Sequence, residues 1–271
     1  MKRTSNFVVA VLFACLMQGC KAKQDPAAPP LSQAGESGAA APATRQAAPL
    51  DPATLGGLSG AVRFMGTPPP AVRIDTSMDP ACTVAGGADF NSEQYVVHDG
   101  KLANVYIYVK SGPAAAMNAP ASPNAPVVLD QKGCRYTPHV IAVMRGQSVS
   151  FENSDATMHN IHTMPASIGS GNEAIDVSQG PKGAPIIKRF NNAEIMMPVR
   201  CNNHPWMNAF INVAATPFFA VSDASGSFDL KGLPAGEYVL GAVHEKLGEQ
   251  TLTVTVSAGN MTKRDFTFRM K

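Results

Sequence analysis

The stretch Val199–Val213, "VRCNNHPWMNAFINV", places Cys201, His204 and Met207 at C-x2-H-x2-M spacing, directly before an apolar run that is typical of a strand. A thiolate, an imidazole and a thioether are soft or borderline donors, which suit copper and suit Mg²⁺ or Ca²⁺ badly. Three donors on one short loop leave a coordination position for a residue from elsewhere in the chain. The stretch therefore predicts one loop of a copper site, held between two strands.

A second group of donors lies upstream, in "NSDATMHNIHTMP", which contains His159 and His162. One of these added to the loop gives two His, one Cys and an axial Met, the ligand set of a blue-copper electron-transfer site. Each residue alone has a plainer interpretation, because a buried Cys is often a core residue and a Met is often a gap filler. Histidines three residues apart can also be surface groups. The combination, in this order and beside strands, favours a metal site.

The composition of the 271 residues predicts an all-β chain. Val, Ile, Thr and Phe recur in short runs that Gly and Pro interrupt, and no long amphipathic helix or repeat is evident. The formal net charge of +2 gives no field that favours nucleic acid. No zinc-protease or Ser/His/Asp pattern is present, so we expect a protein that is not an enzyme. Strands are expected at 127–129, 139–144 and 148–152, near "PIIKRF", "EIMMPVRC" and "AFINVA", and in the C-terminal third, where Asp223–Gly226 gives a hairpin signal. In "LANVYIYVK", Val105, Ile107 and Val109 lie on one face of an expected strand. The segments "MDPACTVAGGADFNSEQ" and "SGPAAAMNAPASPNAP" are expected to be loops.

The N-terminus predicts export. Residues 1–19 combine a basic start, "MKRTSN", with the apolar run "FVVAVLFACLM", which is too short to span a bilayer. "MQGC" then resembles a bacterial lipoprotein signal, which implies lipidation of Cys20; an ordinary cleaved signal is the alternative. Residues 20–57 are rich in Ala, Pro and Ser and predict a disordered, lipid-anchored linker. We expect a bacterial periplasmic or cell-surface protein held at the membrane.

The segments "GQSVSFENSDATMHNIHTMP" and "VRCNNHPWMNAFINV" together resemble the cupredoxin family of blue-copper domains, in their amicyanin- and plastocyanin-like form. The resemblance covers residues 127–215 and implies a Greek-key β-sandwich with one type 1 copper site. The family's first ligand is the histidine that Asn follows, which here is His159. The remaining ligands would be Cys201, His204 and Met207.

The same resemblance implies roles for residues around the ligands. The Asn160 backbone N–H would bond the ligand sulfur and its side chain would hold the Cys201 loop, a support that such sites need. His162 would lie behind the ligands without binding metal. Pro205 and Trp206 would form a stiff, partly apolar rim at which a redox partner docks and through which His204 exchanges electrons.

The C-terminal stretch "AVSDASGSFDLKGLPAGEYVLGAVHEKLGEQTLTVTVSAG" resembles a different family, the carboxypeptidase regulatory-like module, which is a small transthyretin-like β-sandwich. Ser222 stands where that family usually has Thr. The module's opening strands resemble "LSGAVRF" and "ANVYIYV", which lie far upstream. We therefore expect residues 58–112 and 217–271 to form one sandwich into which the cupredoxin is inserted. Two tandem domains with an unrelated N-terminal hairpin are the alternative.

The cysteines can then be counted. Cys15 belongs to the signal, Cys20 to the lipid and Cys201 to the metal, which leaves Cys82 and Cys134 as a disulfide pair in an oxidising compartment. The alternative is a second metal site made by Cys134 and His139 in "GCRYTPHV". Four methionines flank the ligand segments and are expected in the core and at the rim: Met158, Met164, Met196 and Met197.

The functional hypothesis is an exported, lipid-tethered, monomeric blue-copper protein that carries electrons to and from an unidentified redox protein. Two alternatives come from other classes. One is an extracytoplasmic copper-binding protein for storage, delivery or sensing. The other is a surface adhesion module whose cupredoxin fold holds no metal.

Overall fold

The computed structural model describes residues 50–86, 90–120, 125–166 and 171–270, and within them the all-β prediction is confirmed. The signal segment, most of the linker and Cys20 lie outside the described residues. The elements follow in chain order: η1 (Pro52–Thr54), β1 (Leu55–Met65), α1 (Pro80–Gly86), β2 (Val97–His98), β3 (Lys101–Leu102), β4 (Tyr106–Ser111), α2 (Ala114–Met117), β5 (Val127–Gln131), β6 (Tyr136–Thr137), β7 (Val140–Met144), β8 (Ser148–Asn153), β9 (His159–Thr163), β10 (Asp176–Gln179), β11 (Ile186–Arg189), β12 (Glu194–Arg200), β13 (Asn208–Ala214), β14 (Phe219–Val221), β15 (Ser227–Pro234), β16 (Gly236–His244), β17 (Gly248–Val256), β18 (Met261–Lys263) and β19 (Phe266–Arg269).

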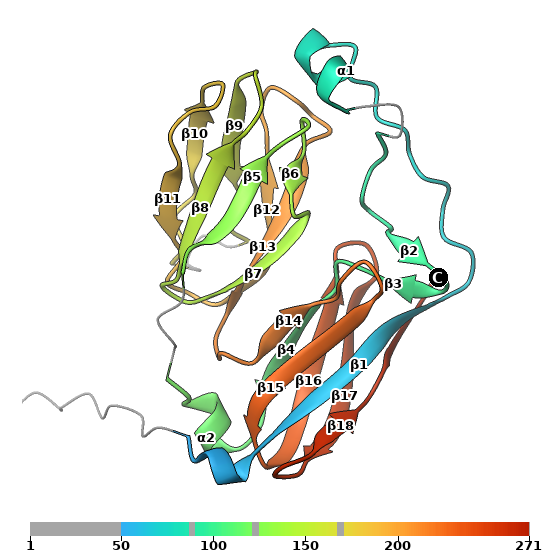
Figure 1. Cartoon of the computed structure of the whole chain (residues 1–271), viewed down its shortest axis with the longest axis vertical. Helices are drawn as coiled ribbons and strands as arrows, with labels where there is room; N and C mark the ends of the chain where they lie inside the picture. Colours follow the sequence, from blue (N-terminus) through green and yellow to red (C-terminus); the bar gives the residue numbers. More distant parts are fainter. Residues whose placement is uncertain (1–49, 87–89, 121–124, 167–170, 271) are drawn as a thin grey trace, which may run out of the picture. The chain divides into compact units, whose positions relative to one another are not determined.

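The middle of the chain forms two facing sheets (Figure 1). One has the strand order β10-β9-β12-β13-β7 and the other the order β11-β8-β5-β6. Both contribute to one buried apolar cluster, with Leu129 and Phe151 from the second sheet and Ile161, Val199 and Ile211 from the first. Alternate residues of each strand point to this cluster, which is the pattern of sheets with one buried face. Cys201 and Met207 belong to the same cluster, so the candidate metal loop is part of this core.

The first and last parts of the chain form two further sheets. One has the order β15-β1-β3-β2, with β18 and β19 also paired to β1, and the other the order β14-β4-β16-β17. Their shared core is apolar and includes Phe64, Leu240 and Phe268. Val105, Ile107 and Val109 alternate into it, as the sequence pattern predicted for that strand.

Strands from distant parts of the chain pair within these sheets. β1 pairs antiparallel with β15 and parallel with β18 and β19. β4 pairs antiparallel with both β14 and β16. Strands that begin at Leu55 and end at Ser111 therefore share sheets with strands beyond residue 218, and the strands from Val127 to Ala214 form sheets of their own.

The turn predicted at Asp223–Gly226 is present, but the strands on either side do not form a hairpin. The Gly226 N–H donates to the Asp223 carbonyl at 2.8 Å, and Gly226 has a φ of +70°, which glycine adopts without strain. The flanking strands β14 and β15 enter different sheets. Ser222, between these two strands, bonds the segment before β4: its hydroxyl donates to the Leu102 carbonyl and accepts from the Val105 N–H, both at 3.0 Å.

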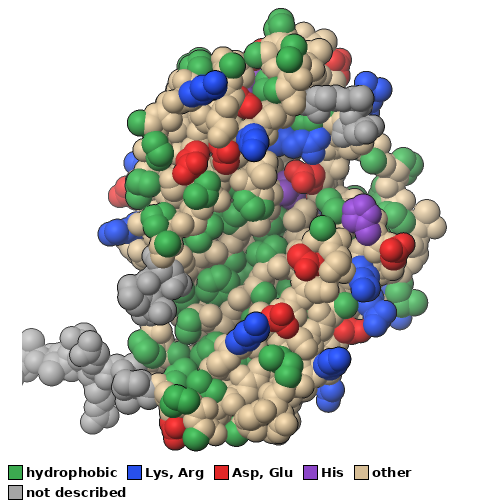
Figure 2. Space-filling view, viewed as in Figure 1, with side chains coloured by type: hydrophobic (Ala, Val, Ile, Leu, Met, Phe, Trp, Pro, Cys, Tyr) green, Lys and Arg blue, Asp and Glu red, His purple; other side chains and the backbone are tan. Residues whose placement is uncertain are grey.

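Two short helices occur in segments that the sequence suggested were loops. α1 begins at Pro80, and Asp79 accepts from the Ala81 N–H at 2.8 Å, a usual way to start a helix. None of the helices in the described part of the chain is long and apolar enough to cross a membrane. On the face drawn in Figure 2, acidic side chains are interspersed with Lys and Arg, in keeping with the small net charge.

Candidate metal centre

The candidate ligands come from two neighbouring strands of one sheet. His159 is the first residue of β9, and Cys201 directly follows the end of β12. β9 and β12 are antiparallel partners, with Arg200 opposite His162. The start of β9 therefore lies beside the end of β12, which brings His159 and Cys201 to the same end of the sandwich.

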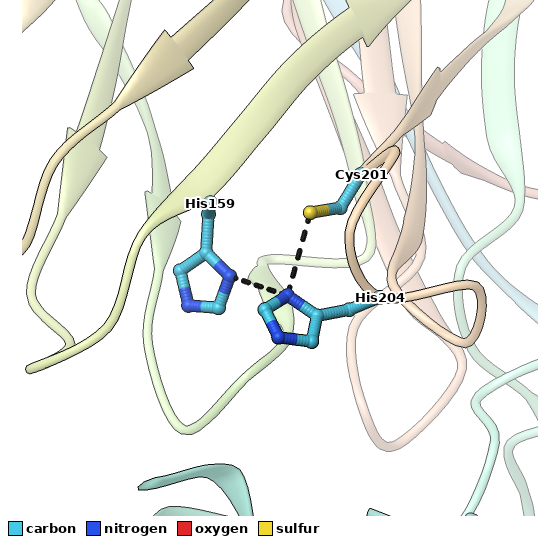
Figure 3. A group of neighbouring side chains, drawn as sticks. All are labelled: His159, Cys201 and His204. Atoms are coloured by element: carbon cyan, nitrogen blue, oxygen red, sulfur yellow. Dashed lines mark hydrogen bonds between the residues drawn. The ribbon is translucent and has the colours of Figure 1, made fainter. Parts of the chain in front are cut away.

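Three buried donor atoms converge at this end (Figure 3). The Nδ1 atoms of His159 and His204 are 3.0 Å apart, and Cys201 Sγ is 3.5 Å from His204 Nδ1. The donor atoms of all three residues lie within 4.8 Å of one another. His159 is fully buried, and Cys201 and His204 are each only 4 % exposed. A thiol and two imidazoles in a dry pocket suit copper or zinc, since both accept nitrogen and sulfur ligands.

The loop between β12 and β13 is closed by its own backbone. The Cys201 N–H donates to the Met207 carbonyl at 3.2 Å, and the Met207 N–H donates to the His204 carbonyl at 2.9 Å. The Met207 side chain is buried in the same core cluster as Cys201. These bonds fix the spacing of the C-x2-H-x2-M motif before a ligand arrives.

The Cys201 sulfur is set up as a thiolate. The Asn160 N–H donates to Sγ at 3.3 Å, and the Asn160 Oδ1 accepts from the Asn202 N–H at 3.4 Å. Burial opposes ionisation of the thiol, but hydrogen bonds from His159 and from the Asn160 and Asn203 amides outweigh it. Together they lower the pKa of Cys201 to about 6. Asn160 thus has both contacts that the resemblance implied for it.

Each imidazole is held from its outer side by a carboxylate. His159 Nε2 is 2.9 Å from Asp155 Oδ2, and His204 Nε2 is 3.1 Å from Asp79 Oδ2. A carboxylate only accepts hydrogen bonds, so Nε2 of each ring carries a proton and Nδ1 faces the sulfur. Such outer hydrogen bonds orient metal-binding histidines and fix their tautomer.

The two carboxylates are themselves anchored. Asp155 is buried and accepts from the Gly133 and Cys134 N–H groups at 2.7 and 2.8 Å. Burial alone would lower the pKa of His159, but the bonds to Asp155 and Cys201 prevail and raise it to about 9. Near neutral pH the metal-free cluster therefore holds a Cys201 thiolate beside a His159 imidazolium.

A disulfide joins Cys82 to Cys134, the pair left over from the cysteine count. It lies against the histidines. The Cys82 sulfur is within 4.8 Å of the Asp79 and His204 donor atoms, and the Cys134 sulfur is within 4.8 Å of those of Asp155 and His159. The alternative metal pair of Cys134 and His139 does not form, because His139 Nε2 instead bonds Glu245 at 2.6 Å.

The other residues singled out in the sequence lie around this cluster. His162 faces away from it, and its Nδ1 bonds Asn202 Oδ1 at 2.9 Å. Pro205 is exposed. Trp206 is half-buried; its ring centroid is 5.2 Å from that of His204, and its Nε1 donates to the Cys134 carbonyl at 3.2 Å. His204 itself is covered by Asp79, which differs from the solvent-facing rim expected from the sequence.

The flanking methionines divide between core and surface. Met197 is fully buried in the same cluster as the metal loop, and Met196 is partly buried against a neighbouring cluster. Met158 and Met164 are 48 % and 42 % exposed. Met197 is therefore a core residue, as expected, whereas Met158 and Met164 lie at the surface.

Sequence reasoning missed two site residues, Asp79 and Asp155. Asp155 had a local signal, since it precedes His159 by four residues in "NSDATMH". Asp79 had none, because it reaches His204 across a sequence separation of 125 residues.

No family model matches the chain, and no curated protein matches it. Among solved structures, the copper-containing nitrite reductase from Thermus scotoductus SA-01 is 23 % identical, with a TM-score of 0.30, over 35 % of this chain. The chain spans 24 % of the length of that reductase. A mutant of amicyanin in its Cu(I) form is 22 % identical, with a TM-score of 0.29, over 41 % of this chain and 98 % of amicyanin.

A purple cupredoxin from Nitrosopumilus maritimus is 18 % identical, with a TM-score of 0.27, over 33 % of this chain and 99 % of that chain. These likenesses cover roughly a third to two fifths of the chain.

Proposed function

We propose that His159, Cys201, His204 and Met207 bind one copper ion and that the protein transfers electrons. The observation that carries this proposal is the convergence of three buried soft or borderline donors whose thiol ionises near neutral pH. A thiolate and two imidazoles with a weak Met ligand form the donor set of a type 1 site. When bound, the copper would supply one-electron chemistry between Cu(I) and Cu(II).

The surroundings of the donors support electron transfer over catalysis. Asp155 and Asp79 hold the two rings, and the Asn160 amide holds the sulfur, so the donors are pre-positioned and little needs to move when the charge changes. The three donors are at most 4 % exposed, which leaves little room for a substrate beside them. We therefore propose an electron carrier that is not an enzyme.

The proposal extends to the place of the protein in the cell. A disulfide next to a thiolate metal site suits an oxidising compartment outside the cytoplasm. With the N-terminal export signal and a lipid at Cys20, the carrier would be tethered to a bacterial membrane and would meet a redox protein there. The interspersed surface charges are in keeping with a monomer that does not bind nucleic acid.

We also propose that the cupredoxin domain, residues 127–215, is inserted into a transthyretin-like sandwich of residues 58–112 and 217–271. The pairing of β1 with β15 and of β4 with β16 supports this division, because each pair joins the two flanking segments within one sheet. In a tandem arrangement each segment would pair within itself.

The proposed function is tested by the visible and EPR spectra of the protein loaded with Cu(II). Wild type should show an intense thiolate-to-copper band, and Cys201→Ser should lose it because a hydroxyl cannot replace the thiolate as a soft ligand. His162→Ala is the matched control, since this imidazole lies on the same strand as His159 but faces away from the cluster. A Cys201→Ser spectrum identical to wild type would refute the proposed site.

Copper storage or delivery is a second candidate that one observation favours: His204 is covered, whereas a carrier that exchanges electrons at this edge would be expected to expose it. The two functions differ in the lability of Cu(I). A storage or delivery protein should surrender Cu(I) readily to a chelator and show no intense thiolate band. A carrier should keep its copper through repeated cycles of oxidation and reduction.

A further inference from the structure

The outer edge of His204 is covered by a segment far away in the sequence. Asp79 Oδ2 lies 3.1 Å from His204 Nε2 and 2.9 Å from the Thr157 hydroxyl, so one carboxylate bridges the loop and the start of β9. Asp79 belongs to residues 74–86, here called the cap, which includes α1. The cap thus closes the end of the candidate metal centre.

Few side chains of the cap pack against the rest of the molecule, although Ile74 packs against the core cluster that contains Cys201. Met78 and Val84 are 73 % and 86 % exposed, so neither side chain holds the cap by packing. α1 has seven residues, too few for a helix to be stable alone in water. Cys82, in contrast, is fully buried and bonded to Cys134. α1 is therefore joined to the rest of the molecule by a covalent bond, and Asp79 lies directly before it.

The disulfide also connects the two carboxylates. Cys82 follows Asp79 by three residues, and the Cys134 N–H donates to Asp155 at 2.8 Å. Asp79 and Asp155 hold the outer nitrogens of His204 and His159 respectively. The disulfide thus joins a cysteine near Asp79 to a cysteine that bonds Asp155, and these two carboxylates hold the two imidazoles.

We propose that Asp79 is a positioning residue for His204 and that the Cys82–Cys134 disulfide delivers it. By accepting the Nε2 hydrogen bond, Asp79 holds the ring in the tautomer whose Nδ1 lone pair faces Cys201 and His159. It also shields the ring edge from water. The inference about copper properties rests on the proposed function, whereas the positioning and shielding of His204 do not.

The first test uses the metal-free protein and diethyl pyrocarbonate, with each modified histidine located by peptide mass mapping. Asp79→Ala should make His204 react several-fold faster than in wild type. Asp79→Asn should keep His204 protected, because the amide oxygen still accepts the hydrogen bond. Asp75→Asn is the matched control; this carboxyl lies in the same cap but bonds the Ser77 N–H, so the reactivity of His204 should not change. His98 is exposed and reports equal reagent exposure in all variants.

The second test asks whether the disulfide acts through Asp79. Cys82→Ser/Cys134→Ser should raise the reactivity of His204 as much as Asp79→Ala does, and adding Asp79→Ala to it should raise it no further, the signature of residues that act as one unit. A protected His204 in the folded cysteine variant would overturn the role of the disulfide. If that variant does not fold, as circular dichroism would show, the Asp79 variants with their intact disulfide still decide the role of Asp79.

The third test uses the copper-loaded protein. Asp79→Ala should weaken copper binding about 10–100-fold, the usual effect of removing an outer hydrogen bond to a ligand. Asp79→Asn should restore most of the affinity yet raise the reduction potential, because a negative charge near the site is gone. If Asp79→Ala matches Asp75→Asn in both His204 reactivity and affinity, the proposal is overturned. If no variant binds copper but Asp79→Ala exposes His204, the positioning role stands and the proposed function falls.

Discussion

The two apolar clusters of this molecule differ in what they bury beside their hydrophobic side chains. The sandwich built around β1, β4 and β16 has a core of aliphatic and aromatic residues, with His244 of β16 buried beside Phe268. The sandwich built around β9, β12 and β13 has a similar core, but at one end it also buries Asp155, His159 and His204 beside the thiol of Cys201. Buried ionisable groups are costly unless each has a partner. Asp155, His159, His204 and Cys201 lie together at one end, which is where we propose the copper site.

The polar end is tolerated because its groups are paired with one another. Among the described residues, Gln131 Oε1 is the buried side-chain oxygen left without a hydrogen-bond partner. The carboxylates, imidazoles and thiol of the metal centre each have one or more partners. We therefore expect the first sandwich to contribute stability and the second to combine stability with the proposed chemistry, a division that mutations can test.

The largest effect is expected at His159. His159→Ala removes a fully buried donor and should abolish tight copper binding and colour, whereas His162→Ala should change both little because its ring faces away. Copper titration followed by absorption compares the two variants. If His162→Ala alone bleaches the protein, the ligand assignment is wrong and His162, not His159, binds the copper.

The apolar sandwich should respond in stability and not in colour. Leu240→Ala, a fully buried position on β16, should lower the free energy of unfolding by about 2–5 kcal/mol, the cost of a core cavity. Urea denaturation measures this loss. Glu237→Ala, an exposed position on the same strand, should stay within about 0.5 kcal/mol of wild type. If Leu240→Ala alters the copper spectrum of the folded protein, the two sandwiches do not have separate roles in stability and in copper binding.

Copper binding should release one proton from the cluster of Cys201, His159 and His204, which makes the copper affinity depend on pH. Between pH values of about 6 and about 9, Cys201 in the metal-free cluster is a thiolate, because its pKa is lowered. In the same range His159 is an imidazolium, because its pKa is raised, and it carries one more proton than the neutral ring that binds metal. Copper must displace this proton, so higher pH favours copper. We expect the apparent affinity to rise roughly tenfold per pH unit in this window and to level off above it. Calorimetric titrations in buffers of different ionisation enthalpy count the proton, and a count of zero near pH 7.5 would contradict the thiolate–imidazolium pair.

The smallest effect is expected at Met207. In a site with two His and one Cys, the axial residue tunes the potential more than it holds the metal. Met207→Leu should keep copper and raise the reduction potential, and Met207→Gln should lower it, since an oxygen donor favours Cu(II). Cyclic voltammetry on both variants makes the comparison. Equal potentials in wild type and both variants would show that Met207 is a core residue only.

The sequence predicted the parts of the site that depend on short spacings. Cys201, His204 and Met207 lie on one loop directly before a strand, so their spacing indicated that they would lie together. The places of His159 and Asn160 followed from the resemblance to cupredoxins. The alternation of Val105, Ile107 and Val109 likewise predicted the buried face of a strand, which the structure confirms.

The rest depended on contacts that no local pattern contains. The cap was invisible in the sequence because Asp79 meets His204 only through a disulfide between cysteines 52 positions apart and through tertiary packing. The turn at Asp223–Gly226 was predicted from its residues, yet its strands enter two different sheets, and the neighbouring Ser222 side chain bonds two backbone groups of a distant segment. Local chemistry specifies a turn, and long-range pairing decides what the turn connects.

The position of β1 in its sheet has a consequence for how the molecule is made. Apart from the short β3, the partners of β1 are β15, β18 and β19, near the end of the chain, whereas β5 to β13 find their partners among themselves. A chain that emerges with its N-terminus first can therefore complete the sheets of the metal centre early. β1 and β4 meanwhile remain edges with open hydrogen-bonding groups, which invite pairing with other chains. Newly made copies at high concentration are thus at greatest risk of aggregation through these two strands, in the interval before residues 219–269 appear.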